Sequence, residues 1–261
     1  MIKNVSTGMK QQPASLKRHL NLLCYSLILC SLPCFSAYAK APLIWTVANF
    51  APHIYIDNQN QVLGPIGEIG TNILAHAGLD YKINHTSNKR AEQFINKEHA
   101  EFGMSSIYTL EKPEDFYISQ YAVHKVQLRA YWFGEHEPVL QASDLRQQSL
   151  ILIGGLKYAG LRDYIEDPSN QVTLAVDVEN HQRALQALKL ARATYMLGYH
   201  FPVVHAQRET KLKDLHSNVI TELGIHFYIK KTSANSQKTM QDLEAAYQLL
   251  YRSAAPVDII H

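Results

Sequence analysis

The sequence predicts an α/β fold divided into two lobes, each with a mostly parallel sheet flanked by helices. Short apolar runs alternate along the chain with segments of helical periodicity, and strands separated by helices are typical of parallel sheets. This alternation restarts after the loop Gly134–Pro138. Removing a predicted signal of 39 residues from the 261-residue chain leaves 222 residues, enough for one large domain or two small lobes.

The first 39 residues are predicted to be a secretory signal peptide. Its basic start contains four cationic residues, Lys3, Lys10, Lys17 and Arg18. An apolar run follows over 20–35, and Ala37-Tyr38-Ala39 supplies the small residues that signal peptidase needs. A membrane-spanning helix is the alternative, but polar residues and Pro33 interrupt the run, which is shorter than the ~20 apolar residues required. We expect cleavage between Ala39 and Lys40 and a periplasmic location.

The remaining chain, 40–261, excludes several classes of site. All three cysteines, Cys24, Cys30 and Cys34, lie in the predicted signal, so no disulfide, cysteine nucleophile or thiolate metal site is expected after cleavage. The same cleavage leaves 21 basic residues against 23 acidic ones, a net charge of −2. This charge gives no electrostatic case for nucleic acid or an anionic membrane as a partner.

In the first half, strands are predicted at 43–48, 81–85, 102–108 and 126–133. These segments are apolar or alternating, and the last is rich in β-branched and aromatic residues. A loop over 49–52 ends the first strand. Helices are predicted where apolar residues recur at helical spacing: from Ile66 to Leu74, ended by Gly78, and from Lys89 to Asn96.

In the second half, Ser143 is predicted to cap a short helix, and Gly154-Gly155 ends the strand at 150–153. Further strands are predicted at 172–176, 193–197, 218–223 and 225–229. Helices are predicted up to Ile165, over 180–190 and over 201–208. The C-terminal helix is amphipathic, with a predicted buried face formed by Met240, Leu243, Tyr247 and Leu250.

Several short motifs, in this order, resemble those of one protein family. They are Phe50-Ala51-Pro52-His53-Ile54, Gly64-Pro65-Ile66-Gly67-Glu68-Ile69, Thr109-Leu110-Glu111-Lys112, Ser119-Gln120-Tyr121, Ser143-Asp144-Leu145, Gly155-Leu156-Lys157-Tyr158 and 224–231. The chain resembles the bacterial extracellular solute-binding proteins (family 3) of polar amino-acid ABC importers, which have the type II periplasmic binding protein fold. Each motif is weak alone, but their common order over 40–261 favours this fold.

The resemblance implies two α/β lobes joined by two crossing strands, with a solute held between them. Lobe 1 would comprise 40–133 plus 225–261, and lobe 2 would comprise 134–224. Hinge closure around a small-molecule ligand would present a closed face to an inner-membrane ABC permease. We expect a monomer that binds a small polar solute, anionic or aromatic, with no cofactor and no metal.

The ligand-binding residues are predicted from these motifs, from strand ends and helix starts, and from positions that correspond to ligand-binding residues of the family. The candidates are Phe50, Arg90, Ser105, Ser106, Lys112, Gly155, Tyr158 and Tyr199. Arg90 would grip a carboxylate through two parallel hydrogen bonds, and the aromatic residues would form walls. The chain departs from the family at two positions. Lys112 replaces the arginine that grips an α-carboxylate, and the stretch 193–199, where an acidic residue takes the ammonium, contains Tyr199 instead. A standard amino-acid ligand is therefore disfavoured.

Other functions stay open. Dehydratases and lytic enzymes occur on this fold, but the sequence has no Gly-x-Ser-x-Gly or phosphate-loop motif, so we expect no catalysis. Twelve of the 13 histidines lie after residue 39, yet none is spaced as a metal motif. A stand-alone periplasmic sensor would need the same closing cleft as an importer's binding protein.

Overall fold

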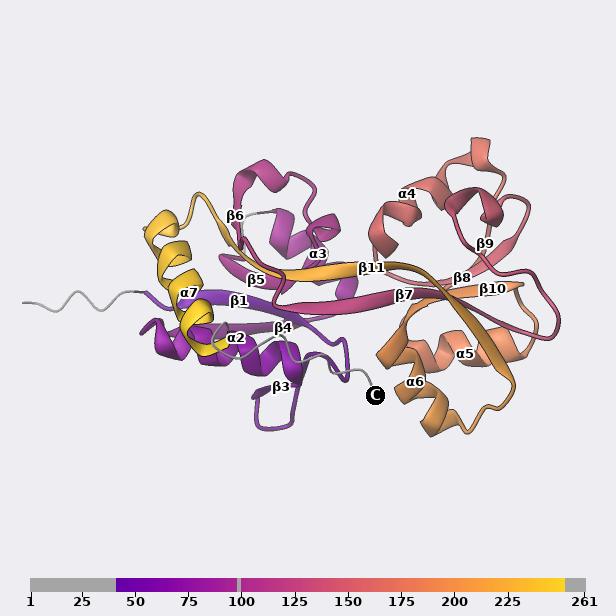
Figure 1. Ribbon diagram of the computed structural model, residues 1–261, viewed down its shortest axis with the longest axis horizontal. Helices are drawn as coiled ribbons and strands as arrows, with labels where there is room; N and C mark the ends of the chain where they lie inside the picture. The colour runs from indigo at the N-terminus through magenta and orange to yellow at the C-terminus, as the bar shows by residue number, and fades with distance from the viewer. Residues whose placement is uncertain (1–40, 98–99, 252–261) are drawn as a thin grey trace, which may run out of the picture. The chain divides into compact units, whose positions relative to one another are not determined.

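The computed structural model describes residues 41–97 and 100–251 (Figure 1). The predicted signal peptide, 1–39, lies outside the described residues. From Ala41 onward the chain forms one compact unit. None of its described helices combines the length and the apolar character needed to cross a bilayer.

The described chain alternates strands and helices, as predicted. The strands are β1 (Leu43–Ala48), β2 (Tyr55–Ile56), β3 (Val62–Leu63), β4 (Tyr81–Thr86), β5 (Phe102–Ser105), β6 (Phe116–Ile118), β7 (His124–Phe133), β8 (Ser149–Ile153), β9 (Thr173–Val178), β10 (Tyr195–Tyr199) and β11 (Leu215–Lys230). The α-helices are α2 (Pro65–His76), α3 (Asn88–Asn96), α4 (Leu161–Glu166), α5 (His181–Lys189), α6 (His200–Thr210) and α7 (Ser236–Tyr251). Five short 3₁₀ turns, η1 to η5, connect these elements over the described residues.

One sheet runs through the described chain in the order β4-β1-β5-β11-β7-β10-β8-β9, and β6 also pairs with β11. At its two ends the neighbouring strands are parallel: β1 pairs with β4 and β5, and β8 pairs with β9 and β10. The antiparallel pairs of this sheet all involve β7 or β11. This arrangement confirms the predicted α/β class, with a parallel ladder at each end of the sheet.

Strands β7 and β11 connect the two ends of the sheet. Residues 215–225 of β11 pair with β7, and residues 226–230 pair with β5 and β6 (Figure 1). The sequence predicted two strands here, separated by Gly224. Gly224 instead pairs with Lys125 inside the ladder, so the segment is one strand of 16 residues.

Each end of the sheet has its own covering helices. On the β1 side, α2 packs on Trp45, which is fully buried, and lies beside α7, which packs against β11 and β6. On the β8 side, α5 and α6 pack against one another and against β10. We call the first part lobe 1 and the second lobe 2, as in the two-lobed fold. The boundaries 134 and 224 remain a prediction.

Two local predictions are wrong. The short turn over Ala142–Leu145 is capped by Gln141, not Ser143, because the Gln141 and Asp144 side chains bond reciprocally to the backbone. Leu250 is exposed on α7, whose buried face comprises Ser236, Thr239, Met240, Leu243 and Ala246. Leu250 follows the buried Leu243 by about two helical turns, but in this last turn Tyr251 rather than Leu250 packs against the core.

Candidate functional site

A cavity of about 120 Å³ lies where the carboxyl ends of β1 and β5 meet a loop of lobe 2. In parallel sheets this end of the strands is the usual place for a ligand. Lobe 1 contributes the end of β1, the first turns of α3 and the residues after β5. Lobe 2 contributes Gly155, Leu156 and Tyr199. Both lobes therefore provide walls of one cavity.

The cavity walls are mainly apolar, with several hydroxyl groups. The apolar part includes Phe50, Ile66, Ile95, Met104 and Leu223. Hydroxyl groups are provided by Thr46, Ser105, Ser106, Thr109, Tyr199 and Tyr228. Glu92 is the one charged residue among the described lining residues. The site can therefore enclose an apolar body and form hydrogen bonds at a few fixed positions.

Phe50 is positioned by a tight loop after β1. Its backbone N–H donates to the carbonyl oxygen of Ile54 at 2.8 Å, and the His53 N–H donates back to the Phe50 carbonyl at 2.9 Å. Gly64 allows this loop to pack closely, since a Cβ on Gly64 would lie 2.5 Å from the Pro52 carbonyl oxygen. The Phe50 ring meets Tyr199 edge to face, with 5.2 Å between ring centroids. An aromatic contact thus joins the lobes beside the cavity.

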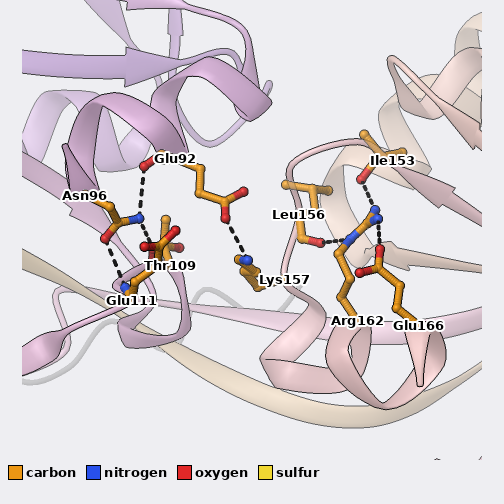
Figure 2. A network of polar contacts seen from close by, with 9 residues as sticks. All are labelled: Glu92, Asn96, Thr109, Glu111, Ile153, Leu156, Lys157, Arg162 and Glu166. Carbon is orange, nitrogen blue, oxygen red and sulfur yellow. Dashed lines mark hydrogen bonds and ion pairs between the residues drawn. The ribbon is translucent and has the colours of Figure 1, made fainter.

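The lobe 2 wall is a glycine loop held by buried polar contacts. Arg162, at the start of α4, donates to the carbonyl oxygens of Leu156 at 2.8 Å and Ile153 at 2.9 Å (Figure 2). It also pairs with Glu166 at 2.9 Å. The Tyr158 hydroxyl accepts from the Ile153 N–H at 2.6 Å and is fully buried. These contacts fix the loop from both sides, and burial raises the pKa of the Tyr158 hydroxyl.

One ion pair crosses the cavity entrance. Nζ of Lys157 lies 2.6 Å from Oε1 of Glu92, and the two side chains are 26% and 18% exposed (Figure 2). The hydrogen bond that Lys157 donates to Glu92 is the main reason that the pKa of Lys157 is raised. One helical turn further on, Asn96 bonds to the Thr109 carbonyl and the Glu111 N–H, which anchors α3 to the loop after β5. Lobe 1 thus holds Glu92 facing lobe 2.

Five of the eight predicted binding residues line the cavity. They are Phe50, Ser105, Ser106, Gly155 and Tyr199. The other three, Arg90, Lys112 and Tyr158, do not line it. The backbone N–H of Arg90 is capped by the Ser87 hydroxyl and its side chain is exposed, Lys112 is exposed before a 3₁₀ turn, and Tyr158 is a core residue. A binding role for these residues remains a prediction.

Sequence reasoning missed the polar residues that shape the site. Glu92 is on the same helix as Arg90, two residues later, and the turn of the helix directs Glu92 rather than Arg90 toward lobe 2. The position of Arg162 could have indicated its role, because an arginine in the helix that follows a glycine loop can donate hydrogen bonds to the carbonyl oxygens of that loop. Over the described residues, no group of three or more histidine, cysteine or acidic side chains could hold a metal ion.

Comparisons with known proteins identify the fold. No family model matches the chain, and no curated protein matches it in sequence. Among solved structures, a histidine kinase sensor domain with similarity to periplasmic binding proteins matches with a TM-score of 0.66 at 13% identity, covering 82% of this chain and 91% of that one. These values show a shared fold.

Two amino-acid binding proteins match over a similar length. An ABC uptake transporter substrate-binding protein from Streptococcus pneumoniae with bound histidine has a TM-score of 0.61 and 16% identity, covering 80% of this chain and 86% of that one. An ancestral arginine-binding protein bound to arginine has a TM-score of 0.62 and 12% identity, covering 82% and 93%. The fold is therefore that of type II periplasmic binding proteins. These neighbours are binding and sensor proteins rather than enzymes.

Proposed function

We propose that the protein captures a small solute in the cavity between its lobes and delivers it to an ABC-type importer. The observation that carries this proposal is the shared cavity, whose walls come from both lobes. A solute there touches both lobes, so its binding free energy favours the state in which they are in contact. The solved structures that share the fold are binding and sensor proteins, which supports a binding role.

The lining favours a compact solute with an apolar or aromatic body. The cavity of about 120 Å³ is close in size to the ~150 Å³ cavity that encloses one benzene molecule. Phe50 and Tyr199 offer ring faces and edges, and Ser105 and Ser106 offer hydroxyl groups. Of the sequence-based alternatives, an aromatic solute fits better than an anionic one. The charged lining residue Glu92 is itself negative, and Lys157 is already paired with it.

A thermal-shift screen of the purified chain tests the proposal. The screen contains aromatic and aliphatic amino acids, organic acids, phenols, sugars and metal salts, at pH 7.5. A ligand present at 100 times its dissociation constant stabilises the folded state by about 2.7 kcal/mol, a clear shift in melting temperature. Binding should be lost in Phe50→Ala and kept in Tyr121→Phe, a conservative change away from the cavity. No stabilisation by any class of small molecule would contradict the proposal.

A stand-alone sensor is the second candidate, favoured by the similarity to a histidine kinase sensor domain. An importer's binding protein and a sensor use the same closing cleft, so the solute screen supports both. Affinity purification with the solute bound separates them. Recovery of a transmembrane permease favours import, and recovery of a receptor with a signalling domain favours sensing.

A further inference from the structure

A buried histidine, His53, and a partly buried one, His124, form a pair beside Phe50 on the lobe 1 side. Nε2 of His124, the first residue of β7, lies 3.1 Å from Nδ1 of His53. His53 is 3% exposed, and its ring stacks on Phe50 at 5.3 Å between centroids. A hydrogen bond between two imidazoles requires at least one unprotonated nitrogen. The pair can therefore not hold two positive charges, and at least one of the two rings must be neutral.

Two histidines of lobe 2 face this pair. His181 is the first residue of α5 and contacts Phe50 at 6.5 Å between centroids. His200 is the first residue of α6, and the next residue, Phe201, packs edge to face on His53 at 5.3 Å. Both histidines therefore occupy helix N-termini, where the helix dipole disfavours a positive charge. The four residues, which we call the histidine cluster, come from both sides of the cleft.

The cluster contains buried ring nitrogens without partners. Within the described residues, Nε2 of His53, Nε2 of His181 and Nδ1 of His200 are buried and make no hydrogen bond. A neutral imidazole leaves an unpaired nitrogen at modest cost, whereas a protonated ring needs a partner for each N–H. No ion pair involves these four residues in the described chain; the histidine that does pair with a carboxylate is His205, with Glu209.

The charged groups around the cluster do not compensate a positive charge. Arg129 of β7 acts on His200 with the same sign and is itself bonded to Gln127 and Ser217. Lys125 and Glu222 pair with each other, and strand alternation places Lys125 on the face opposite to His124. Tyr199, a buried phenol on β10, contacts Phe50, and the Glu179–Arg183 pair flanks His181 at the start of α5.

We propose that the histidine cluster makes closure of the cleft dependent on pH, so that acidification separates the lobes and releases the solute. When the lobes are in contact, one ring nitrogen each of His53, His181 and His200 is buried without a hydrogen-bond partner, so a proton placed there would have no acceptor. Separation gives each ring access to water, where protonation costs nothing extra. Proton uptake and opening are then linked, and each histidine that gains a proton on opening raises the opening constant up to about tenfold per pH unit.

The titration of the cluster supports this inference. Burial, followed by the neighbouring His124, His181 and His200, lowers the pKa of His53 to about 3. Burial lowers the pKa of His181 to about 4. It also lowers the pKa values of His124 and His200. The inference rests on the proposed solute-binding function for its biological meaning, but the switch itself is a property of the empty cleft.

Small-angle X-ray scattering of the full chain without added solute tests the switch. As the pH falls from 7.5 to 5.0, the radius of gyration of the native protein should increase, with far-UV circular dichroism unchanged. His53→Gln/His181→Gln should show a smaller increase over this range, because two of the four histidines that gain a proton on opening are removed. The matched control His76→Gln/His85→Gln, at two exposed histidines, should behave as the native protein does. A constant radius in the native protein, or an equal increase in the cluster variant, would overturn the proposal.

A milder variant covers the case in which the double substitution prevents folding. His200→Gln removes one half-buried proton acceptor, so the midpoint of the opening transition should move to lower pH. An unchanged midpoint would count against the cluster. Because these measurements use no solute, they stand apart from the solute screen at pH 7.5. A negative screen with a positive scattering result would reject the binding function alone.

Discussion

Gly155 of lobe 2 lies directly against the backbone of Lys89 in lobe 1. A Cβ built on Gly155 would be 2.4 Å from the Lys89 nitrogen and 2.6 Å from the Asn88 carbonyl carbon. Backbone atoms at the start of a helix cannot move aside as a flexible side chain can. The glycine therefore sets how closely the two lobes approach each other.

Gly155→Ala should hold the lobes apart while leaving each lobe folded. Separation relieves the clash, so we expect a larger radius of gyration by X-ray scattering and at least tenfold weaker binding of any solute found by the screen. Gly134→Ala is the matched control. Gly134 has a φ of 77°, close to the 79° of Gly155, but no atom lies within 4 Å of its added Cβ. Both variants carry a backbone strain of about 1–2 kcal/mol. Equal radii for the two would contradict the contact.

The Glu92–Lys157 pair should contribute to closure more than a surface pair does. A double-mutant cycle with Glu92→Gln and Lys157→Met, followed by urea unfolding, should give a coupling free energy of about 1 kcal/mol. The cross-strand pair Lys125–Glu222, with side chains 72% and 46% exposed, is the control and should give at most about 0.5 kcal/mol. Similar coupling free energies for both pairs would show that partial burial does not strengthen the Glu92–Lys157 ion pair.

Arg162→Lys should destabilise the protein although it keeps the charge. Lysine cannot reach two carbonyl oxygens and a carboxylate at once, so buried acceptors in the Gly155 loop lose their donors. We expect the free energy of unfolding to fall by about 2–4 kcal/mol, measured by chemical denaturation. Arg183→Lys changes an arginine whose side chain is 63% exposed and should cost less than about 0.5 kcal/mol. A tolerated Arg162→Lys would mean that the loop holds its shape without the guanidinium.

Global stability should fall as the pH drops below about 6.5. The folded state lowers the pKa of His53 to about 3 and that of His181 to about 4, from 6.5 in the unfolded chain. The unfolded chain therefore binds more protons than the closed folded state between these values, so stability rises with pH as long as the lobes stay in contact. Each histidine contributes about 1.4 kcal/mol per pH unit. Denaturation between pH 7 and 5 measures the slope, and His181→Gln should reduce it; an unchanged slope would show that His181 is not enclosed.

Much of the fold could be predicted from local patterns. The strand at 43–48 was recognised with its observed bounds because a continuous apolar run between a polar segment and a turn is typical of a buried strand. Asn180, whose side chain caps α5, marks that helix in the sequence. By contrast, the hairpin of β2 and β3 was missed, because two-residue strands carry no periodicity. The 16-residue β11 was divided at Gly224, since a glycine usually weakens a strand.

The sequence predicts the cavity-lining residues correctly only where the position of the backbone alone places a residue at the cavity. Ser105 is the last residue of β5, Phe50 and Gly155 come two residues after β1 and β8, and strand ends meet at the same edge of a sheet. The sequence pattern does not indicate which side of the helix over 88–96 faces lobe 2, so it predicts Arg90 rather than Glu92 as the residue in the site. The histidine cluster brings together residues 53, 124, 181 and 200, whose spacing in the sequence matches no motif. Only the packing of two lobes places them together.

The continuity of the sheet has a mechanical consequence. Since β11 pairs with β7 along one part of its length and with β5 and β6 along the rest, one continuous strand belongs to both lobes. Relative movement of the lobes should therefore twist this pair of strands. Their regular pairing is interrupted at the register shift between Val219 and Thr221, which is the expected place for such a twist. We therefore expect the torsional stiffness of the two strands at this shift to limit how far and how fast the lobes separate.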